Sequence, residues 1–128
     1  MADFYQTGVI STLHRLGEFK LDKIESELEA FSKVRPIALV LPCLYSELQG
    51  PALGPIVQQL KEVRYLSQIV ISLGRANYNE FQHAQEFFSV LPQDKTVLIW
   101  LDSERITRLR QVLETNRLKL GPEGKARA

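Results

Sequence analysis

The stretch Pro36-Ile37-Ala38-Leu39-Val40-Leu41-Pro42 is an uninterrupted apolar run with a proline at each end. Because it shows no alternation of polar and apolar residues, it is typical of a strand covered on both faces, as in a parallel sheet. It is far shorter than the roughly 20 residues that a membrane-spanning helix needs. The run therefore predicts a buried parallel strand.

Two further apolar runs, at residues 68–73 and 96–101, repeat this arrangement, and a helical spacing of apolar residues follows every run. Residues suited to the cap or first turn of a helix come before each helical stretch: Pro51, Asn77 with Glu80, and Asp102 or Ser103. Three strand–helix units in series predict parallel strands joined by right-handed crossovers.

The regions on either side complete the predicted domain organisation. Residues 1–35 have helical periodicity broken near Gly17 and predict an N-terminal helical segment. Residues 36–120 predict a βαβαβα half-domain of the α/β class, a three-stranded parallel sheet with helices on both faces. Residues 121–128 lose the apolar period, and we expect a flexible tail. Because sheets usually carry about 5–6 strands, we expect the chain to be the N-terminal part of a longer one.

The composition narrows the possible partners. The 128 residues are 45% hydrophobic and 24% charged, with 16 basic and 15 acidic side chains. This near-neutral balance argues against nucleic acid or an anionic membrane as partner. A single cysteine, Cys43, excludes an internal disulfide and a multi-cysteine metal site. The N-terminus lacks the features of a signal peptide, so we expect a cytoplasmic protein.

An open parallel sheet binds its ligands beyond the carboxyl ends of its strands. In this chain those ends are residues 42–47, 74–77 and 102–105, so a small-molecule site should draw on these three loops. None of them has the Gly-x-Gly-x-x-Gly or Walker pattern. A usual dinucleotide fold and a P-loop enzyme are therefore not supported.

The first strand and its loop, ending in Pro42-Cys43-Leu44-Tyr45-Ser46-Glu47, carry a resemblance to a known family. They resemble the corresponding part of family-2 glycosyltransferases with the GT-A fold, where the loop is Pro-x-x-Asn-Glu-Glu-like. More narrowly, the chain resembles the N-terminal region of glucosyl-3-phosphoglycerate synthases. The segment 124–128 is similar to the Gly-Lys-Gly-type segment that follows the third unit in that family. The order of predicted strands and helices matches the family over residues 36–128. The sequence motifs themselves match only in two short stretches, the loop after the first strand and the segment 124–128.

The resemblance implies a nucleotide-sugar donor, UDP-glucose, and Mg²⁺ or Mn²⁺ in the complete enzyme. That enzyme would transfer glucose to 3-phosphoglycerate or a similar acceptor. It also implies that backbone groups of the first loop face the uracil, that an acid of this loop binds the ribose, and that a lysine faces the diphosphate. The candidate substrate-binding residues are Pro42, Cys43, Leu44, Ser46, Glu47, Arg75, Asp102 and Lys125.

The chain also departs from the family pattern. Ser46 stands at the first acidic position of the loop, and Glu47 follows one place later. Arg75 lies where the family usually carries aspartates. The metal-binding Asp-x-Asp motif is absent. Since carboxylate-held metal normally neutralises the leaving diphosphate, we expect this chain to have no catalytic residue and no metal of its own, and to be inactive alone.

Two alternatives remain open. The first is a non-catalytic α/β binding or protein-interaction module whose exposed sheet edge pairs with a partner. The second is a small flavodoxin-like or receiver-like domain, although a receiver needs an acidic cluster at the strand ends and only Asp102 is there. Homo-oligomerisation, or association with a missing C-terminal part, is compatible with each reading.

Overall fold

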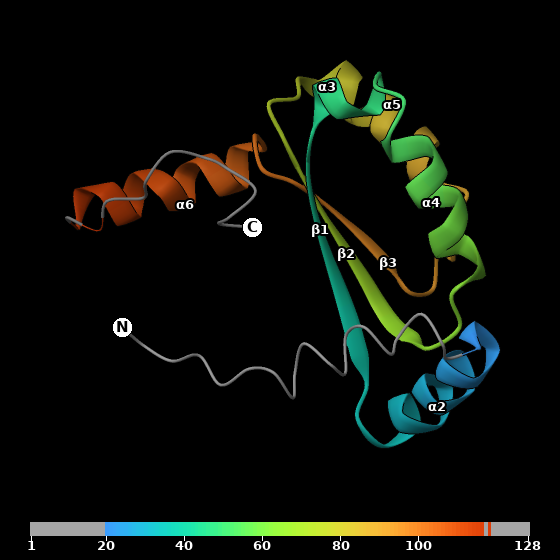
Figure 1. The fold of residues 1–128 in the computed structure, drawn as a ribbon. Helices are drawn as coiled ribbons and strands as arrows, with labels where there is room; N and C mark the ends of the chain where they lie inside the picture. The colour runs from blue at the N-terminus through green and yellow to red at the C-terminus, as the bar shows by residue number, and fades with distance from the viewer. Residues whose placement is uncertain (1–19, 117, 119–128) are drawn as a thin grey trace, which may run out of the picture.

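The computed structural model describes residues 20–116 and 118. Its centre is a three-stranded sheet of β1 (Ile37–Leu44), β2 (Leu66–Gly74) and β3 (Thr96–Trp100). The strands are in the order β1-β2-β3 and both pairings are parallel, so the predicted α/β parallel sheet is confirmed (Figure 1). The proline inside β1, Pro42, is tolerated because β1 is an edge strand, where a missing N–H need not cost a ladder hydrogen bond.

Helices lie on both sides of the sheet. The helices α4 (Leu53–Glu62) and α5 (Tyr78–Phe88) cover one face, and α6 (Glu104–Thr115) projects from the opposite side (Figure 1). The short helix α3 (Tyr45–Leu48) follows β1 at the carboxyl ends of the strands. The helix α2 (Leu21–Val34) lies at their other end. The described helices include none that is long and apolar enough to span a membrane.

The core lies between the sheet and the pair α4 and α5. The side chains of Ile71 and Leu73 in the central strand are completely buried. The helices contribute the buried residues that cover them: Leu53 and Val57 from α4, and Ala84 and Phe88 from α5. Burial of apolar surface is the main favourable contribution to the free energy of folding. It fixes the positions of the three loops at the end of the sheet.

The other face of the sheet is much less covered. On this face Val70 of the central strand lies between Val40 of β1 and Val97 of β3. Two residues further along β2, Ser72 lies beside Ile99 of β3. The sequence predicted a strand covered on both faces, yet Val40 is 52% exposed and Val97 is 42% exposed. The difference arises because α6 stands away from the sheet in the described part of the chain, and none of its side chains is fully buried.

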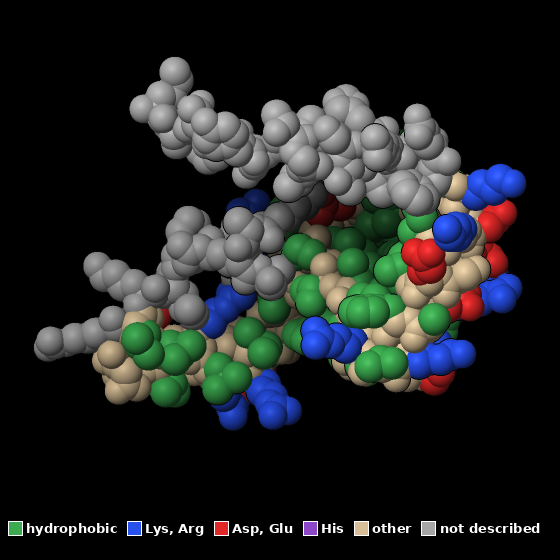
Figure 2. All heavy atoms as spheres, turned by 60° about the horizontal axis from the view of Figure 1, so that its bottom comes forward, with side chains coloured by type: hydrophobic (Ala, Val, Ile, Leu, Met, Phe, Trp, Pro, Cys, Tyr) green, Lys and Arg blue, Asp and Glu red, His purple; other side chains and the backbone are tan. Residues whose placement is uncertain are grey.

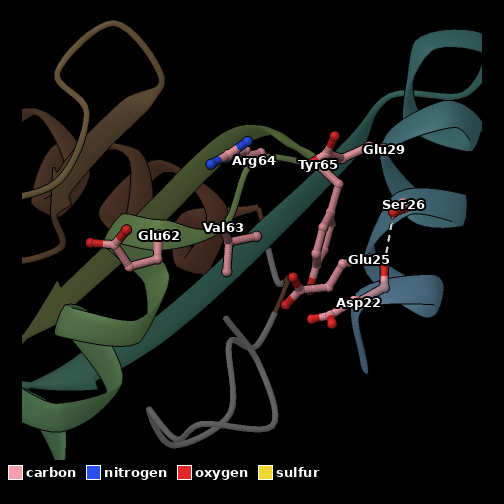
Figure 3. A pocket seen from close by; sticks show the side chains of 8 residues that line it. All are labelled: Asp22, Glu25, Ser26, Glu29, Glu62, Val63, Arg64 and Tyr65. Carbon is pink, nitrogen blue, oxygen red and sulfur yellow. Dashed lines mark hydrogen bonds between the residues drawn. The ribbon is translucent and has the colours of Figure 1, made fainter. Parts of the chain in front are cut away.

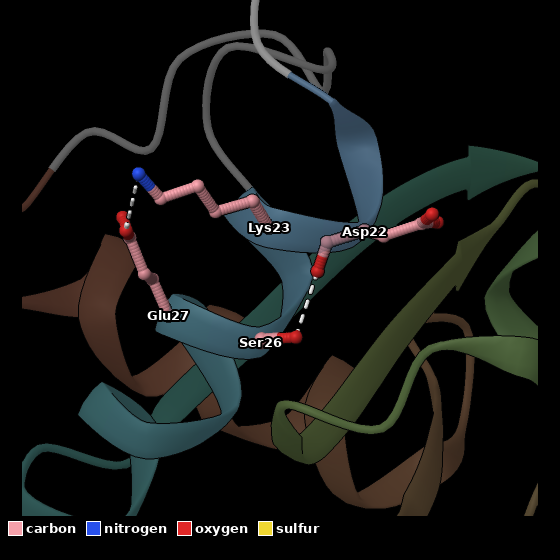
Figure 4. A network of polar contacts seen from close by, with 4 residues as sticks. All are labelled: Asp22, Lys23, Ser26 and Glu27. Atoms are coloured by element: carbon pink, nitrogen blue, oxygen red, sulfur yellow. Dashed lines mark hydrogen bonds and ion pairs between the residues drawn. The ribbon is translucent and has the colours of Figure 1, made fainter.

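Of the segment 1–35 that the sequence predicts to be helical, Leu21–Val34 form α2, and residues 1–19 lie outside the described part of the chain. Lys23 Nζ pairs with Glu27 Oε1 at 4.0 Å, and the hydroxyl of Ser26 donates to the backbone oxygen of Asp22 at 2.8 Å (Figure 4). Such exposed contacts contribute little, about 0–1 kcal/mol. The helix also has no buried residue, so it adds little to the core.

The structure locates the helix starts that the sequence could place only approximately. Asn77 caps α5 as predicted, because its side chain accepts from the N–H of Glu80 at 2.9 Å and the Glu80 carboxylate accepts from the N–H of Asn77 at 2.7 Å. The cap of α6 is Ser103, since its hydroxyl accepts from the Ile106 N–H at 3.5 Å. The helix expected at Pro51 begins at Leu53.

We predict that Ile71→Ala lowers the free energy of unfolding by about 2–5 kcal/mol, because it leaves a cavity in a completely buried site. Ile56→Ala is the matched control, since Ile56 on α4 is 44% exposed and should cost less than about 1 kcal/mol. Urea unfolding followed by circular dichroism measures both. Equal losses would contradict the placement of the core.

Candidate functional site

The parallel register brings the three strand-end loops to one rim of the molecule. Leu44 is opposite Gly74, and Leu73 is opposite both Cys43 and Trp100. The chain leaves the sheet at the same end after each strand, so the predicted alignment of residues 42–47, 74–77 and 102–105 is confirmed. We call this edge the rim.

The first loop of the rim is shorter than the sequence indicated, because β1 continues through Leu44. Cys43 is 5% exposed and belongs to the core, so its side chain is not available to a ligand. The carboxylate of Glu47 accepts a hydrogen bond from the N–H of Leu44 at 2.8 Å, closing the first turn of α3. Ser46 is exposed on the same helix, while Pro42 and Glu47 are partly buried.

A contact between α3 and α5 connects this loop to the helix layer. The hydroxyl of Tyr45 lies 3.0 Å from Nδ1 of His83, and the two rings meet edge to face with centroids 5.9 Å apart. His83 is exposed. Its contact with Tyr45 joins two segments that are distant along the chain, which periodicity could not reveal.

The second and third loops are joined through the backbone of Ala76. Its N–H donates to Oδ2 of Asp102 at 3.0 Å, and its carbonyl accepts from Nε1 of Trp100 at 2.8 Å. The indole of Trp100 also stacks on Phe81, with ring centroids 5.0 Å apart and planes 10° from parallel. We call the pair of hydrogen bonds from Asp102 and Trp100 to the backbone of Ala76 the Ala76 clamp.

The clamp explains an unusual backbone conformation next to it. Arg75 has φ of 52°, the only positive φ at a non-glycine residue in the described ranges. A left-handed conformation costs an ordinary residue about 1–2 kcal/mol, and such strain persists where its surroundings fix it. Here Ala76 is held on both its polar groups, so Arg75 is held in place and its exposed guanidinium stands on the rim.

The candidate residues are therefore only partly brought together. Pro42, Cys43, Leu44, Ser46 and Glu47 lie on or beside the end of β1, with Arg75 and Asp102 following the neighbouring strands on the same rim. The Asp102 carboxylate already accepts from Ala76, which makes it a support of the second loop. The remaining candidate, Lys125, lies outside the described residues.

The described residues do not form a metal site. Between residues 20 and 118 no group of three or more histidine, cysteine, aspartate or glutamate side chains lies close enough to hold an ion. The donors that Mg²⁺ or Mn²⁺ would need are carboxylates, and the one aspartate on the rim, Asp102, is bonded to a backbone N–H. The metal expected for the complete enzyme therefore does not fit the described part of this chain.

An acidic hollow lies at the opposite end of the sheet from the rim. It has a volume of about 430 Å³ and is lined by residues of α2 and of the segment between α4 and β2: Asp22, Glu25, Ser26, Glu29, Glu62, Val63, Arg64 and Tyr65. The side chain of Tyr65 points toward α2 in Figure 3. Four carboxylates against one guanidinium repel a diphosphate, so the hollow is unsuited to a nucleotide sugar. The rim is the better candidate.

The fold and the rim define an α/β protein of the class that holds ligands at the carboxyl ends of parallel strands, consistent with the N-terminal, Rossmann-like part of a glycosyltransferase. Two relatives identify a particular family within this class. All 128 residues match a glucosyl-3-phosphoglycerate synthase of Persephonella marina at 44% identity, covering 32% of that protein. A glucosyl-3-phosphoglycerate synthase of Methanococcoides burtonii is 35% identical over 109 residues, which are 84% of the chain and 26% of that relative.

These matches confirm the resemblance to glucosyl-3-phosphoglycerate synthases that the loop motifs indicated. The chain spans about a third or less of the length of each of these curated relatives. No family model matches the sequence, and no solved structure matches it. The likeness therefore rests on these relatives and on the strand order.

We predict that Arg75→Gly raises the free energy of unfolding by about 0.5–1 kcal/mol. Relief of about 1–2 kcal/mol of left-handed strain exceeds the roughly 0.5–1 kcal/mol that glycine costs through the entropy of the unfolded chain. Arg64→Gly is the matched control, because Arg64 is an exposed arginine whose φ is not positive, and it should lower stability. Urea denaturation of both variants measures this, and destabilisation by Arg75→Gly would contradict the strain.

The clamp itself generates a second prediction. Asp102→Ala should cost about 1–3 kcal/mol, because it removes the acceptor of a partly buried N–H. Trp100→Phe should cost about 0.5–1.5 kcal/mol through the lost Nε1 hydrogen bond, since the ring still stacks on Phe81. Asp94→Ala, at an exposed position away from the rim, is the control and should change the unfolding midpoint little.

Proposed function

We propose that the chain is the nucleotide-sugar-binding part of a glycosyltransferase. The observation that carries the proposal is the match of the whole chain to part of a glucosyl-3-phosphoglycerate synthase, together with the rim that the parallel strands form. The complete enzyme would transfer glucose from UDP-glucose to 3-phosphoglycerate or a similar phosphorylated acceptor. This chain would supply the donor side of that site.

In the proposed complex the end of β1 receives the nucleoside. Backbone atoms of Pro42, Cys43 and Leu44 face the uracil, and the loop residues Ser46 and Glu47 face the ribose. The Glu47 carboxylate accepts from the Leu44 N–H, which orients it. A carboxylate offers about four acceptor sites, so this bond is compatible with accepting a ribose hydroxyl as well. The same bond makes the shape of the loop depend on Glu47.

The diphosphate is assigned to the basic residues of the rim. The guanidinium of Arg75 is exposed beside the end of β1 and suits a bidentate contact with phosphate oxygens. Asp102 acts here as a positioning residue, because it holds the peptide that follows Arg75. Lys125 is the second cation of the proposal by resemblance to the family segment.

Binding and catalysis separate in this proposal. Sugar transfer requires that the charge of the leaving diphosphate be neutralised, which a bound Mg²⁺ or Mn²⁺ supplies in the complete enzyme. The carboxylates that would hold the ion are not among the described residues. The chain alone is therefore proposed to bind the donor without transferring the sugar.

A second candidate function, a protein-interaction module, is favoured by one observation. The sheet face formed by Val40, Val70, Val97 and Ile99 is apolar and partly exposed. Such a surface is typical of an interaction site. Donor binding separates the two candidates, because a module without a donor site has no reason to bind UDP-glucose at the rim.

We predict that calorimetric titration detects binding of UDP-glucose and UDP to the 128-residue chain. Arg75→Gln should weaken this binding about tenfold or more, because a charged hydrogen bond is worth about 1.5–3 kcal/mol and 1.4 kcal/mol is a factor of ten. Arg64→Gln is the matched control at the opposite end of the sheet, and it should bind like the unchanged chain. Absence of binding by the unchanged chain would refute the donor site.

We also predict no release of UDP from UDP-glucose by the purified chain in the presence of Mg²⁺ or Mn²⁺, because the described residues include no metal-holding group. A coupled assay for UDP measures this, with heat-denatured chain as the background. Metal-dependent turnover above that background would contradict the proposed division between binding and catalysis.

A further inference from the structure

The helix α3 is too short to hold its shape alone. It consists of four residues, Tyr45–Leu48, whereas isolated helices shorter than about 12–15 residues are marginal in water. Contacts with other parts of the chain must therefore fix its orientation. The proposed donor site depends on this single turn, because Ser46 and Glu47 lie on it. Whatever holds the turn also decides where these two side chains stand.

Tertiary contacts hold the turn at both ends. Its last residue, Leu48, is 8% exposed and belongs to the core. Its first residue, Tyr45, packs against the core, and the Tyr45 hydroxyl lies 3.0 Å from Nδ1 of His83. The hydrogen bond from the Leu44 N–H to Glu47 is local, because the two residues are three positions apart. The Tyr45–His83 contact, in contrast, connects the turn to another helix, α5.

His83 lies on a helix that the core holds firmly. The next residue, Ala84, is completely buried, and Phe88 of the same helix is 2% exposed. The rings of Tyr45 and His83 meet edge to face at 71°, with centroids 5.9 Å apart. The hydroxyl can donate to Nδ1 or accept from it, so either tautomer of His83 keeps the hydrogen bond. The helix α5 therefore fixes the first residue of α3, which lies beside it in Figure 1.

We propose that His83 is a positioning residue of the donor site: through Tyr45 it orients the turn that carries Glu47 for a ribonucleotide. A carboxylate is an acceptor for hydroxyl hydrogens, and 2′-deoxyribose lacks one of the two neighbouring hydroxyls that ribose offers. An oriented turn keeps the Glu47 carboxylate at these hydroxyls, whereas a turn free to rotate does not. The ligand class is therefore a ribonucleoside diphosphate in preference to its 2′-deoxy form. The inference rests on the proposed function, because it requires the ribose of the donor to lie at this turn.

Calorimetric titration of the 128-residue chain with UDP and with 2′-deoxy-UDP tests this proposal. The unchanged chain should bind UDP about tenfold more tightly, because the deoxy form lacks a hydroxyl that the carboxylate would bond. His83→Ala and Tyr45→Phe should each weaken UDP binding about two- to tenfold and weaken 2′-deoxy-UDP binding less. The preference for UDP should therefore fall in both variants.

Rescue by a conservative variant separates positioning from a general loss of stability. His83→Asn keeps a polar group near the place of Nδ1 that can bond the Tyr45 hydroxyl, so it should retain most of the preference for UDP. Gln82→Ala is the matched control on α5, because Gln82 is also exposed and its Nε2 donates to the hydroxyl of Tyr78 at 3.2 Å. It should leave the preference unchanged. A lower free energy of unfolding with an unchanged preference in His83→Ala would show a merely structural role and overturn the proposal.

A second control lies on another helix. Hydrophobic side chains gather along α6 in Figure 2, and Leu109 on this helix is 53% exposed. Leu109→Ala removes an exposed apolar side chain that has no part in the contact between α3 and α5, so it should also leave the preference for UDP unchanged. A loss of preference in either control as large as in His83→Ala would contradict the role assigned to His83.

Hydrogen exchange without nucleotide distinguishes failure of this inference from failure of the donor site. His83→Ala should speed exchange of the Leu44 amide, whose acceptor Glu47 lies on the turn, and Gln82→Ala should not. Unchanged exchange in His83→Ala would overturn the positioning role even where the chain binds UDP. Equal binding of UDP and 2′-deoxy-UDP by the unchanged chain would overturn the ribose selection. Binding of neither nucleotide would refute the donor site, and with it the ribose selection, whatever the exchange shows about His83 and the turn.

Discussion

The parallel pairing of β2 with a strand on either side is the constraint on which the rest of the structure depends. It requires a crossover after β1 and another after β2, and right-handedness places both crossover helices on the same face. The helices then bury Ile71 and Leu73 from one side. The same pairing makes all three strands end at one edge. Core, exposed face and rim are therefore consequences of a single topology.

The rim is built largely from backbone and support groups. Glu47 fixes the turn after β1 by accepting from Leu44, and Asp102 with Trp100 fixes the turn after β2 through Ala76. Among the described residues of the rim, Arg75 is the cation that the proposed function uses. In the proposed function this rim binds the nucleotide, and the metal ligands come from outside the described residues, among which no metal-binding group is found. The chain spans about a third or less of the length of each of the two relatives.

Both ends of the sheet carry charge, but with different chemical consequences. The hollow beside α2 gathers four carboxylates around Tyr65. The rim presents the exposed Arg75 near the strand ends, where the three loops lie side by side. The hollow therefore disfavours an anionic ligand, while the rim offers the exposed Arg75 as a contact for one. This difference separates the candidate donor site from the hollow.

The sequence by itself determined the elements and their order. The apolar runs predicted three parallel strands, the cap at Asn77 was placed correctly, and the loop after Pro42 pointed to the family that the two relatives confirm. These features depend on local periodicity and local hydrogen bonds, which a linear pattern records. Only the tertiary structure decided that Asp102 supports Ala76, that Arg75 is left-handed, and that within the described ranges one sheet face is only partly covered. Each of these depends on residues that are distant in sequence and meet only after the strands have paired.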